Sequence, residues 1–255
     1  MLFPLFLAAV SWLAGFLGGL TGTGGIIMPP LMIELFGLQP HYAMALAQAS
    51  YVIPSILAVI LFLRKGQFNW RIAFPLAAAG FAFSFWAARD LKPLLNTGWL
   101  TLVYAVCIVI SGAVMLWKSS LTLSRPLAPP WRTPILLLAG AAVGLMAGVT
   151  GSGTNSVLVP LLFFFGLDAL NVLAAGQFFT VLSSSAGTFG NVANMDINFV
   201  HVGIMVATQM FGMWAGVRLA QRSDTDRLKK YVGIVCFLAG LFMVIKAVYG
   251  MAYSG

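Results

Sequence analysis

Long apolar segments without charge constrain the fold of this chain of 255 residues more than any other feature. Charged residues make up only 8% of the chain and are confined to a few short stretches, separated by apolar segments of about 17 to 23 residues. A helix of that length crosses the roughly 30 Å hydrocarbon core of a bilayer, whereas the strands of a membrane barrel would alternate in polarity. The sequence therefore predicts an all-α integral membrane protein whose surroundings are the lipid bilayer.

The sequence matches itself at an offset of 129 residues. Without a gap, residues 15–48 superpose on residues 144–177 with 10 identities in 34 positions. We expect two homologous membrane units, residues 1–117 and residues 134–255. A polar, proline-rich cytoplasmic linker at residues 118–133 would join them.

Each unit is predicted to hold a long apolar segment, a glycine-rich break, a short apolar segment and three longer helices. The expected helices are 3–20, 26–36, 41–63, 70–88 and 98–117 in the first unit, and 134–149, 155–165, 170–193, 199–219 and 228–250 in the second. The short segment of about 11 residues rises only about 16 Å and cannot cross a membrane alone. Either it continues across behind the first helix, which gives parallel units, or it folds back as a re-entrant hairpin, which gives inverted units.

Lysine and arginine favour the inverted arrangement. With inverted units, the loops 64–71, 118–132 and 218–230 share one side of the membrane and carry 11 of these residues, against 3 on the other side. With parallel units, each side carries seven. Cytoplasmic loops are enriched in Lys and Arg, so we expect inverted repeats with both termini outside.

The two glycine-rich breaks are the candidate site. Backbone that is not helical at membrane depth must line a cavity or be packed in protein. A new helix follows each break, and the amides of residues 24–26 and 153–155 would point out of its N-terminus, where the helix dipole is positive. Two such N-termini, facing one another in inverted units, would bind an oxyanion without any fixed positive charge.

Hydroxyl and amide side chains would complete this site. The predicted substrate-binding residues are Thr21, Gly22, Thr23, Gly24, Gly25 and Gln48 in the first unit, and Thr150, Gly151, Ser152, Gly153, Thr154, Asn155, Ser156 and Gln177 in the second. Two buried glutamines at equivalent positions indicate a shared role, because a buried amide in lipid is costly without partners.

Several of these residues have a simpler interpretation. Thr23 and Ser152 are equally expected as helix N-caps. The GxxxG spacing at Gly15 and Gly19, repeated in the second unit at 144 and 148, is more typical of close helix packing than of a binding site. Glu34 is the only acid inside an apolar run of the first unit. It could carry a proton, but we favour an interfacial position for its carboxylate.

Other classes of function lack their sequence features. No GK[ST] motif follows either glycine break, which excludes a P-loop, and no predicted strand precedes one, which excludes a Rossmann nucleotide site. The net charge of +8 comes from residues at helix ends, so nucleic acid is not an expected partner. Neither an enzyme nor a metal or other cofactor is expected.

Three sequence motifs resemble the TauE/SafE sulfite exporter family, also called the toluene sulfonate uptake permeases. They are the glycine-rich segment 15–25, the Gly-Leu-Gln-Pro turn at 37–40 and the Arg-Lys-Gly-Gln-Phe-Asn-Trp loop at 64–70. The resemblance covers about residues 9–247. It implies a duplicated protein of the bacterial inner membrane that moves sulfite or small organosulfonates outward or inward. Thr154 and Asn155 stand where members of the family often have glycine and apolar residues.

The expected function is secondary transport of a small anion, sulfite or an organosulfonate, held between two helix N-termini near the middle of the membrane. An anion channel and a membrane partner protein that transports nothing are the alternatives. Proton coupling and a homodimer are both compatible with the sequence.

Overall fold

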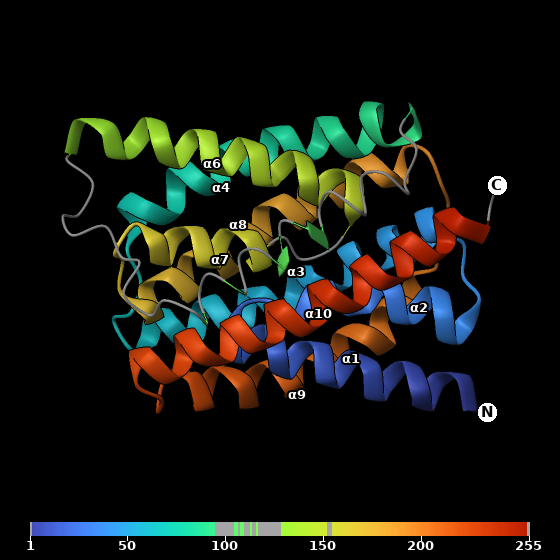
Figure 1. Cartoon of the computed structure of the whole chain (residues 1–255), viewed down its shortest axis with the longest axis horizontal. Helices are drawn as coiled ribbons and strands as arrows, with labels where there is room; N and C mark the ends of the chain where they lie inside the picture. The colour runs from blue at the N-terminus through green and yellow to red at the C-terminus, as the bar shows by residue number, and fades with distance from the viewer. Residues whose placement is uncertain are drawn as a thin grey trace.

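The computed structural model describes residues 2–94, 105–106, 108–109, 113, 116, 129–151 and 155–253. All elements within these ranges are helices, and they lie side by side with their axes close to one direction (Figure 1). The long elements of the first half are α1 (Leu2–Thr21), α2 (Met28–Phe36), α3 (Pro40–Arg64) and α4 (Trp70–Trp86). Those of the second half are α6 (Pro129–Thr150), α7 (Asn155–Phe164), α8 (Ala169–Val192), α9 (Phe199–Ala220) and α10 (Thr225–Tyr253).

Short polar side chains and glycine decide where these helices begin and end. The side-chain oxygens of Asn69, Asp168 and Asn198 accept bonds from backbone amides at the starts of α4, α8 and α9, which satisfies donors that have no partner within the helix. α2 ends at Gly37, whose φ of 63° is the left-handed conformation that commonly terminates a helix.

Two helix boundaries differ from the sequence prediction. The helix predicted at 70–88 is longer in the structure, because α4 is followed without a break by a π-helical turn, η2 (Ala87–Leu91), and a 3₁₀ turn, η3 (Lys92–Leu94). α6 begins at Pro129, inside the predicted loop, because Pro129 and Pro130 occupy the first turn, where a missing N–H costs no hydrogen bond. The predicted helix 98–117 lies mostly outside the described residues.

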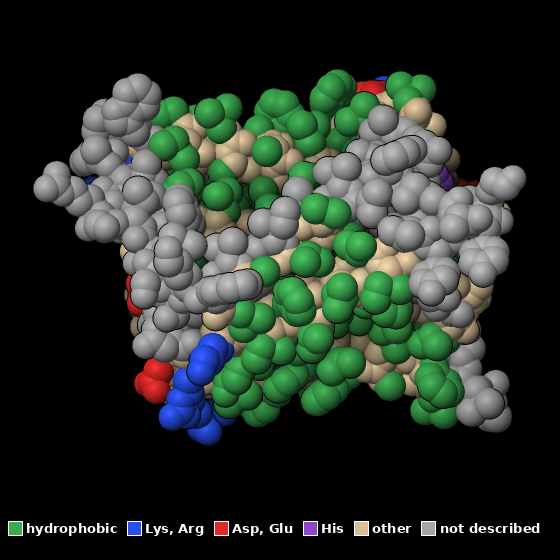
Figure 2. Space-filling model, viewed as in Figure 1, with side chains coloured by type: hydrophobic (Ala, Val, Ile, Leu, Met, Phe, Trp, Pro, Cys, Tyr) green, Lys and Arg blue, Asp and Glu red, His purple; other side chains and the backbone are tan. Residues whose placement is uncertain are grey.

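Among the described residues, five helices are long and apolar enough to cross a membrane. They span residues 40–64, 70–94, 132–150, 169–192 and 199–220. Apolar side chains also cover most of the described surface in Figure 2, while Lys and Arg gather at one end of it. The exposed side of α9 includes Phe211 and Val200, which are 72% and 73% exposed. A surface of this kind belongs against lipid tails.

Glycines allow four of these helices to pack in close pairs. α1 packs on α9, where a Cβ on Gly212 or Gly216 would collide with the α1 backbone at Trp12 or Phe16. α6 packs on α4 in the same way, with Gly144 against Gly80. The packing interpretation of the GxxxG pairs is therefore confirmed, and each helix before a glycine break has its close partner in the other half of the chain.

Side-chain contacts fix the directions of α3 and α9. Gln209 Nε2 donates to Ser50 Oγ at 2.9 Å, and about three turns further along both helices Gln221 Nε2 donates to the carbonyl oxygen of Leu61 at 3.2 Å. The two helices therefore run in the same direction.

The directions of α4 and α8 are fixed similarly. The Phe179 ring lies against Gly80, and one turn further along both helices Ser84 Oγ donates to the carbonyl oxygen of Ser183 at 2.8 Å. α4 therefore runs parallel to α8. Because only residues 65–69 join α3 to α4, those two helices run in opposite directions, and α3 is antiparallel to α8 (Figure 1).

The helix α2 returns the chain toward the end where α1 begins. α1 runs parallel to α9, because Trp12 and Phe16 meet Gly212 and Gly216 in that order. α3 is also parallel to α9, so the chain must turn back between the end of α1 and the start of α3. The nine residues of α2 rise only about 14 Å along this return. The start of α1 and the end of α10 lie at the same end of the molecule (Figure 1).

Candidate functional site

Both glycine breaks begin with the same backbone geometry. α1 ends at Thr21 and α6 ends at Thr150, and the next residues, Gly22 and Gly151, have φ values of 77° and 59°. Each of these two glycines still donates its amide to the carbonyl oxygen four residues earlier, at 2.9 Å in both cases. A left-handed residue at this point stops the helix, and only glycine adopts it without strain.

The threonines beside the breaks bond within their own segments. Thr21 Oγ1 donates to the carbonyl oxygen of Leu17 at 2.8 Å, and Thr150 Oγ1 donates to that of Met146 at 2.7 Å. The hydroxyls of Thr21 and Thr23 lie 2.6 Å apart. Thr23 occupies the N-cap position of the turn η1 (Gly24–Ile26), as the simpler interpretation expects, but its side chain makes no capping bond to that turn. Ser152, Gly153 and Thr154 lie outside the described residues.

The two predicted glutamines connect the halves of the chain reciprocally. Gln177 Nε2 donates to the carbonyl oxygen of Gly18 at 2.7 Å, and Gln48 Nε2 donates to that of Ala147 at 3.1 Å. The two acceptors are equivalent in the 129-residue offset, and each lies one turn before a break. Each glutamine therefore holds the helix end that precedes the break of the other half.

A small cavity of about 20 Å³ lies where the first break meets α3, α7, α8 and α9. Its volume is room for about one water molecule. The polar side chains that line it come from four helices, and none of the described lining residues is charged. These polar residues are Tyr51, Ser55, Asn155, Gln177, Thr180 and Gln209.

The polar groups of the cavity are held in place by bonds to their neighbours. Tyr51 donates its hydroxyl to the carbonyl oxygen of Gly25 at 2.8 Å, which ties α3 to the first break. Asn155 Nδ2 donates to Thr180 Oγ1 at 2.7 Å. Asn155 Oδ1 is buried and has no hydrogen-bond partner among the described residues. Since buried polar atoms are normally satisfied, this oxygen has capacity to accept a hydrogen bond from water or from a ligand that carries a proton.

The structure brings only some of the predicted residues together at the cavity. Gly22 and Gly25 of the first break line it, and so do Asn155 and Gln177 of the second half. The other described members are buried nearby but outside the lining: Thr21, Thr23, Gly24, Gln48, Thr150, Gly151 and Ser156. Gly24 serves packing, because a Cβ there would collide with the α1 backbone at Ala14 and Gly18.

The predicted substrate-binding set lacks four polar lining residues, Tyr51, Ser55, Thr180 and Gln209. In the 129-residue offset Tyr51 is equivalent to Thr180 and Ser55 to Ser184, whereas Gln209 is equivalent to Gly80 and has no polar counterpart. A polar side chain within a long apolar helix was the available signal, because such residues in membrane helices face the protein interior. Gln209, 1% exposed in the middle of α9, carries that signal most clearly.

Lys92 is the second finding that the sequence did not predict. Its side chain is 2% exposed, and Nζ donates to Asn191 Oδ1 at 2.8 Å and to the carbonyl oxygen of His41 at 3.3 Å. Asn191 in turn donates to Gln48 Oε1 at 2.9 Å. A chain of hydrogen bonds thus joins Lys92 to the glutamine that holds the second break. In the sequence, Lys92 is only one of the three cations on the less basic side of the predicted membrane arrangement.

Two further features of the sequence concern metal binding and proton transfer. No three His, Cys, Asp or Glu side chains in those ranges come together as metal ligands would. The side chain of Glu34 lies outside the described residues.

The apolar helices, with polar side chains gathered at a small cavity between them, define a multi-pass α-helical membrane protein. Residues 7–243 match the family model described as Sulfite exporter TauE/SafE. The chain belongs to this family, which confirms the resemblance carried by the three sequence motifs.

Curated relatives are named as membrane transporters. A probable membrane transporter protein of Sinorhizobium fredii is 28% identical over 178 residues, 69% of this chain and 70% of that protein. Similar proteins with that description occur in Methanocaldococcus jannaschii, 20% identical over 96% of each chain, and in Bacillus subtilis, 20% identical over 95% of this chain and 98% of that one. No solved structure matches the chain.

Proposed function

We propose that this protein is a secondary transporter that carries a small oxyanion, sulfite or an organosulfonate, across the inner membrane of a bacterium. The anion binds in the cavity between the first glycine break, Asn155 and Gln177, and it reaches the two sides of the membrane alternately. The observation that carries this proposal is an uncharged cavity with six polar side chains in its lining, beside the first break, together with the reciprocal glutamine bonds that hold the helix end before each break.

The chemistry of the cavity suits an anion. Each amide nitrogen of Asn155, Gln177 and Gln209 carries two protons, and one of them is used in a bond to the protein. Each amide can therefore donate one further bond to an oxygen of the ligand. Neutral donors bind an anion without the cost of burying a fixed charge. A cavity of about 20 Å³ must widen to admit sulfite, so this structure corresponds to a closed state of the site.

The helix directions support an arrangement of the two halves as inverted repeats, which suits transport by alternating access. α3 and α8 are equivalent in the sequence offset and antiparallel in space, and α2 returns the chain as a re-entrant segment would. The loop 64–71 and the loop 218–230 then lie on the same side, which the positive-inside rule assigns to the cytoplasm. Two halves of opposite orientation can expose a central site to either side by similar movements.

Flux of radiolabelled sulfite into proteoliposomes tests this function. We expect uptake that saturates with concentration and accelerates when unlabelled sulfite or taurine is inside the vesicles. Uptake no faster than in protein-free vesicles, for sulfite and for a panel of organosulfonates, would contradict the proposal. Single-channel currents without saturation would instead indicate a channel.

Asn155→Asp tests the position of the anion. The substitution keeps the size of the side chain but adds a carboxylate to the cavity. Like charges about 4 Å apart repel by roughly 4 kcal/mol at an effective dielectric constant of 20, so we expect sulfite flux to fall at least about a hundredfold.

Asn69→Asp is the matched control for this substitution. Asn69 caps α4 outside the cavity, and aspartate is an equally good N-cap. Its flux should stay at the wild-type level. Normal flux in the Asn155→Asp variant would place the anion elsewhere.

A further inference from the structure

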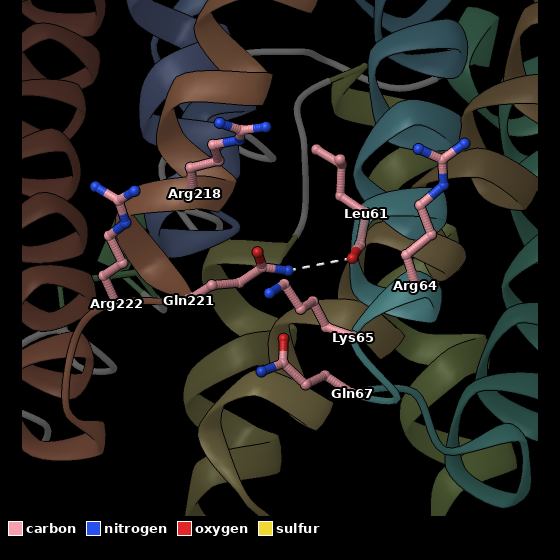
Figure 3. Close-up of a pocket in the computed structure, with 7 residues that line it drawn as sticks. All are labelled: Leu61, Arg64, Lys65, Gln67, Arg218, Gln221 and Arg222. Atoms are coloured by element: carbon pink, nitrogen blue, oxygen red, sulfur yellow. Dashed lines mark hydrogen bonds between the residues drawn. The ribbon is translucent and has the colours of Figure 1, made fainter.

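A second pocket, of about 480 Å³, lies between the C-terminal ends of α3 and α9 (Figure 3). Ligand pockets for small organic molecules have volumes of this order. Four of its seven lining residues are cations, Arg64 and Lys65 from α3 and Arg218 and Arg222 from α9. We call it the basic pocket.

The basic pocket is strongly positive. None of the described residues that line it carries a carboxylate. The nearby Asp224 pairs with Arg227, at 3.6 Å between the side chains, and both are highly exposed. Arg64 and Arg218 stand on facing helices on opposite sides of the opening, and the amide of Gln221 lies between those helices (Figure 3). A concave surface lined by one sign of charge concentrates counter-ions.

The same two helices line the basic pocket and the small cavity. Tyr51 and Ser55 of α3 face the cavity, and Leu61, six residues or about 9 Å further along α3, already belongs to the basic pocket. On α9, Gln209 and Met213 line the cavity and Arg218 lines the basic pocket. The pocket and the cavity therefore follow one another along α3 and α9.

The equivalent place at the other end of the molecule is closed. There α8 and α4 take the positions of α3 and α9, and Lys92 stands where Gln221 stands in the basic pocket. The bonds of Lys92 hold this end together, and Asn194 Nδ2 donates to the carbonyl oxygen of Arg89 at 2.9 Å. A Cβ on Gly190 would lie 2.9 Å from the carbonyl oxygen of Phe85, so the helices touch directly.

From this difference between the two ends, we propose that the basic pocket is an anion-binding site on the transport path. It takes a freely diffusing sulfite or small sulfonate at the end that the charge distribution assigns to the cytoplasm, next to the central cavity. The inference rests on the proposed transport function for the path, but the binding of an anion here is a separate property. An anionic lipid headgroup carries similar oxyanion chemistry, and the experiment distinguishes the two sources.

Charged thiol reagents measure the potential in the basic pocket. Gln221→Cys places a thiol in it, in a background with Cys107→Ser and Cys236→Ala. The protein is held in nanodiscs of phosphatidylcholine and treated with an anionic sulfonatoethyl or a cationic trimethylammonium-ethyl methanethiosulfonate. We expect the anionic reagent to react faster, and methanesulfonate to slow its reaction. Arg218→Gln combined with Arg222→Gln should lower the anionic-to-cationic rate ratio by roughly tenfold.

Arg71→Gln is the matched control, because Arg71 is exposed at the same end of the molecule but does not line the pocket. It should leave the rate ratio within about twofold of the parent value, since screening by salt weakens distant charges. Gln67→Cys places the thiol on the opposite wall and repeats the measurement if Gln221→Cys disturbs folding.

Anionic lipid provides the second arm of the test. With phosphatidylglycerol added to the nanodiscs, protection by methanesulfonate should persist. If phosphatidylglycerol protects the thiol and methanesulfonate does not, the pocket is a lipid site and the proposal is wrong. An anionic-to-cationic rate ratio that stays unchanged in the Arg218→Gln, Arg222→Gln double variant would also overturn the proposal.

Flux measurements separate this proposal from the transport function. The Arg218→Gln, Arg222→Gln double variant should raise the KM for sulfite several-fold and leave kcat unchanged. Protection by methanesulfonate in a protein that transports no anion would support the binding site and contradict the transport function. Flux without protection would contradict the binding site alone.

Discussion

Gln48 and Gln177 make the same hydrogen bond but have different surroundings. Each donates to a carbonyl oxygen one turn before a glycine break, yet only Gln177 lines the cavity. Gln48 also accepts a bond from Asn191. Gln48 thus shows the structural role of the glutamine amide alone, whereas Gln177 combines it with the role in anion binding that we propose.

Substitution of each glutamine by methionine should therefore have opposite principal effects. Gln48→Met removes two buried hydrogen bonds, each worth roughly 1 to 3 kcal/mol when a partner is left unsatisfied, and should lower the melting temperature more. Gln177→Met removes one such bond and a donor to the ligand, and should raise the KM for sulfite more. Thermal unfolding and proteoliposome flux measure the two effects. An equal rise in KM for both variants would mean that both glutamines contact the anion.

The sequence predicted the breaks and Gln177 because both depend on local chemistry. Glycine at high density ends a helix wherever it occurs, and a buried amide in an apolar helix requires partners. The contribution of Tyr51 and Gln209 depends on how α3 and α9 pack, which no local pattern encodes. Lys92 was missed for the same reason, since this residue at the start of η3 is buried where it contacts α3 and α8.

At the scale of the helices, small residues set the distances between α1 and α9 and between α4 and α6. The helix lengths followed from the apolar runs, but the partners of each helix did not, because a glycine face fits any other smooth face. Only the three-dimensional arrangement shows that the main partner of α1 is α9 and not a helix that follows it directly in sequence.

Two glycines on α9 provide a controlled test of this packing. Gly212 lies against the α1 backbone, whereas nothing lies within 4 Å of a Cβ built on Gly203. Gly212→Ala should destabilise the protein by about 1 to 3 kcal/mol through overpacking, and Gly203→Ala should be neutral or stabilise it by up to about 1 kcal/mol. Thermal denaturation of the detergent-solubilised protein checks both. Equal stability of the two variants would refute close packing of α1 on α9.

At the scale of the whole molecule, Lys and Arg side chains gather at one end of the described surface (Figure 2). Its basic end is hollowed between α3 and α9, and the opposite end is closed around Lys92. The 129-residue offset therefore relates two halves that are alike in their bonds at the breaks and different at their outer ends. In a transporter, such a difference distinguishes an inward-facing state from an outward-facing one.

Epitope tags test the orientation of the halves in the membrane. A tag at the N-terminus and one at the C-terminus should be accessible from outside the cell, and one inserted in residues 118–128 only after permeabilisation. Antibody labelling of intact and permeabilised cells makes the measurement. If the N-terminal tag and the inserted tag are accessible from the same side, the halves are not inverted.

The pairing of α1 with α9 and of α6 with α4 has a consequence for the history of the chain. A polypeptide of half this length would expose two glycine faces, one before its break and one on its last close-packed helix. A second copy inserted in the opposite orientation would cover both and would receive the same glutamine bonds. The antiparallel course of α3 and α8, which are equivalent in the sequence offset, is the arrangement that joining two such copies into one gene product would produce.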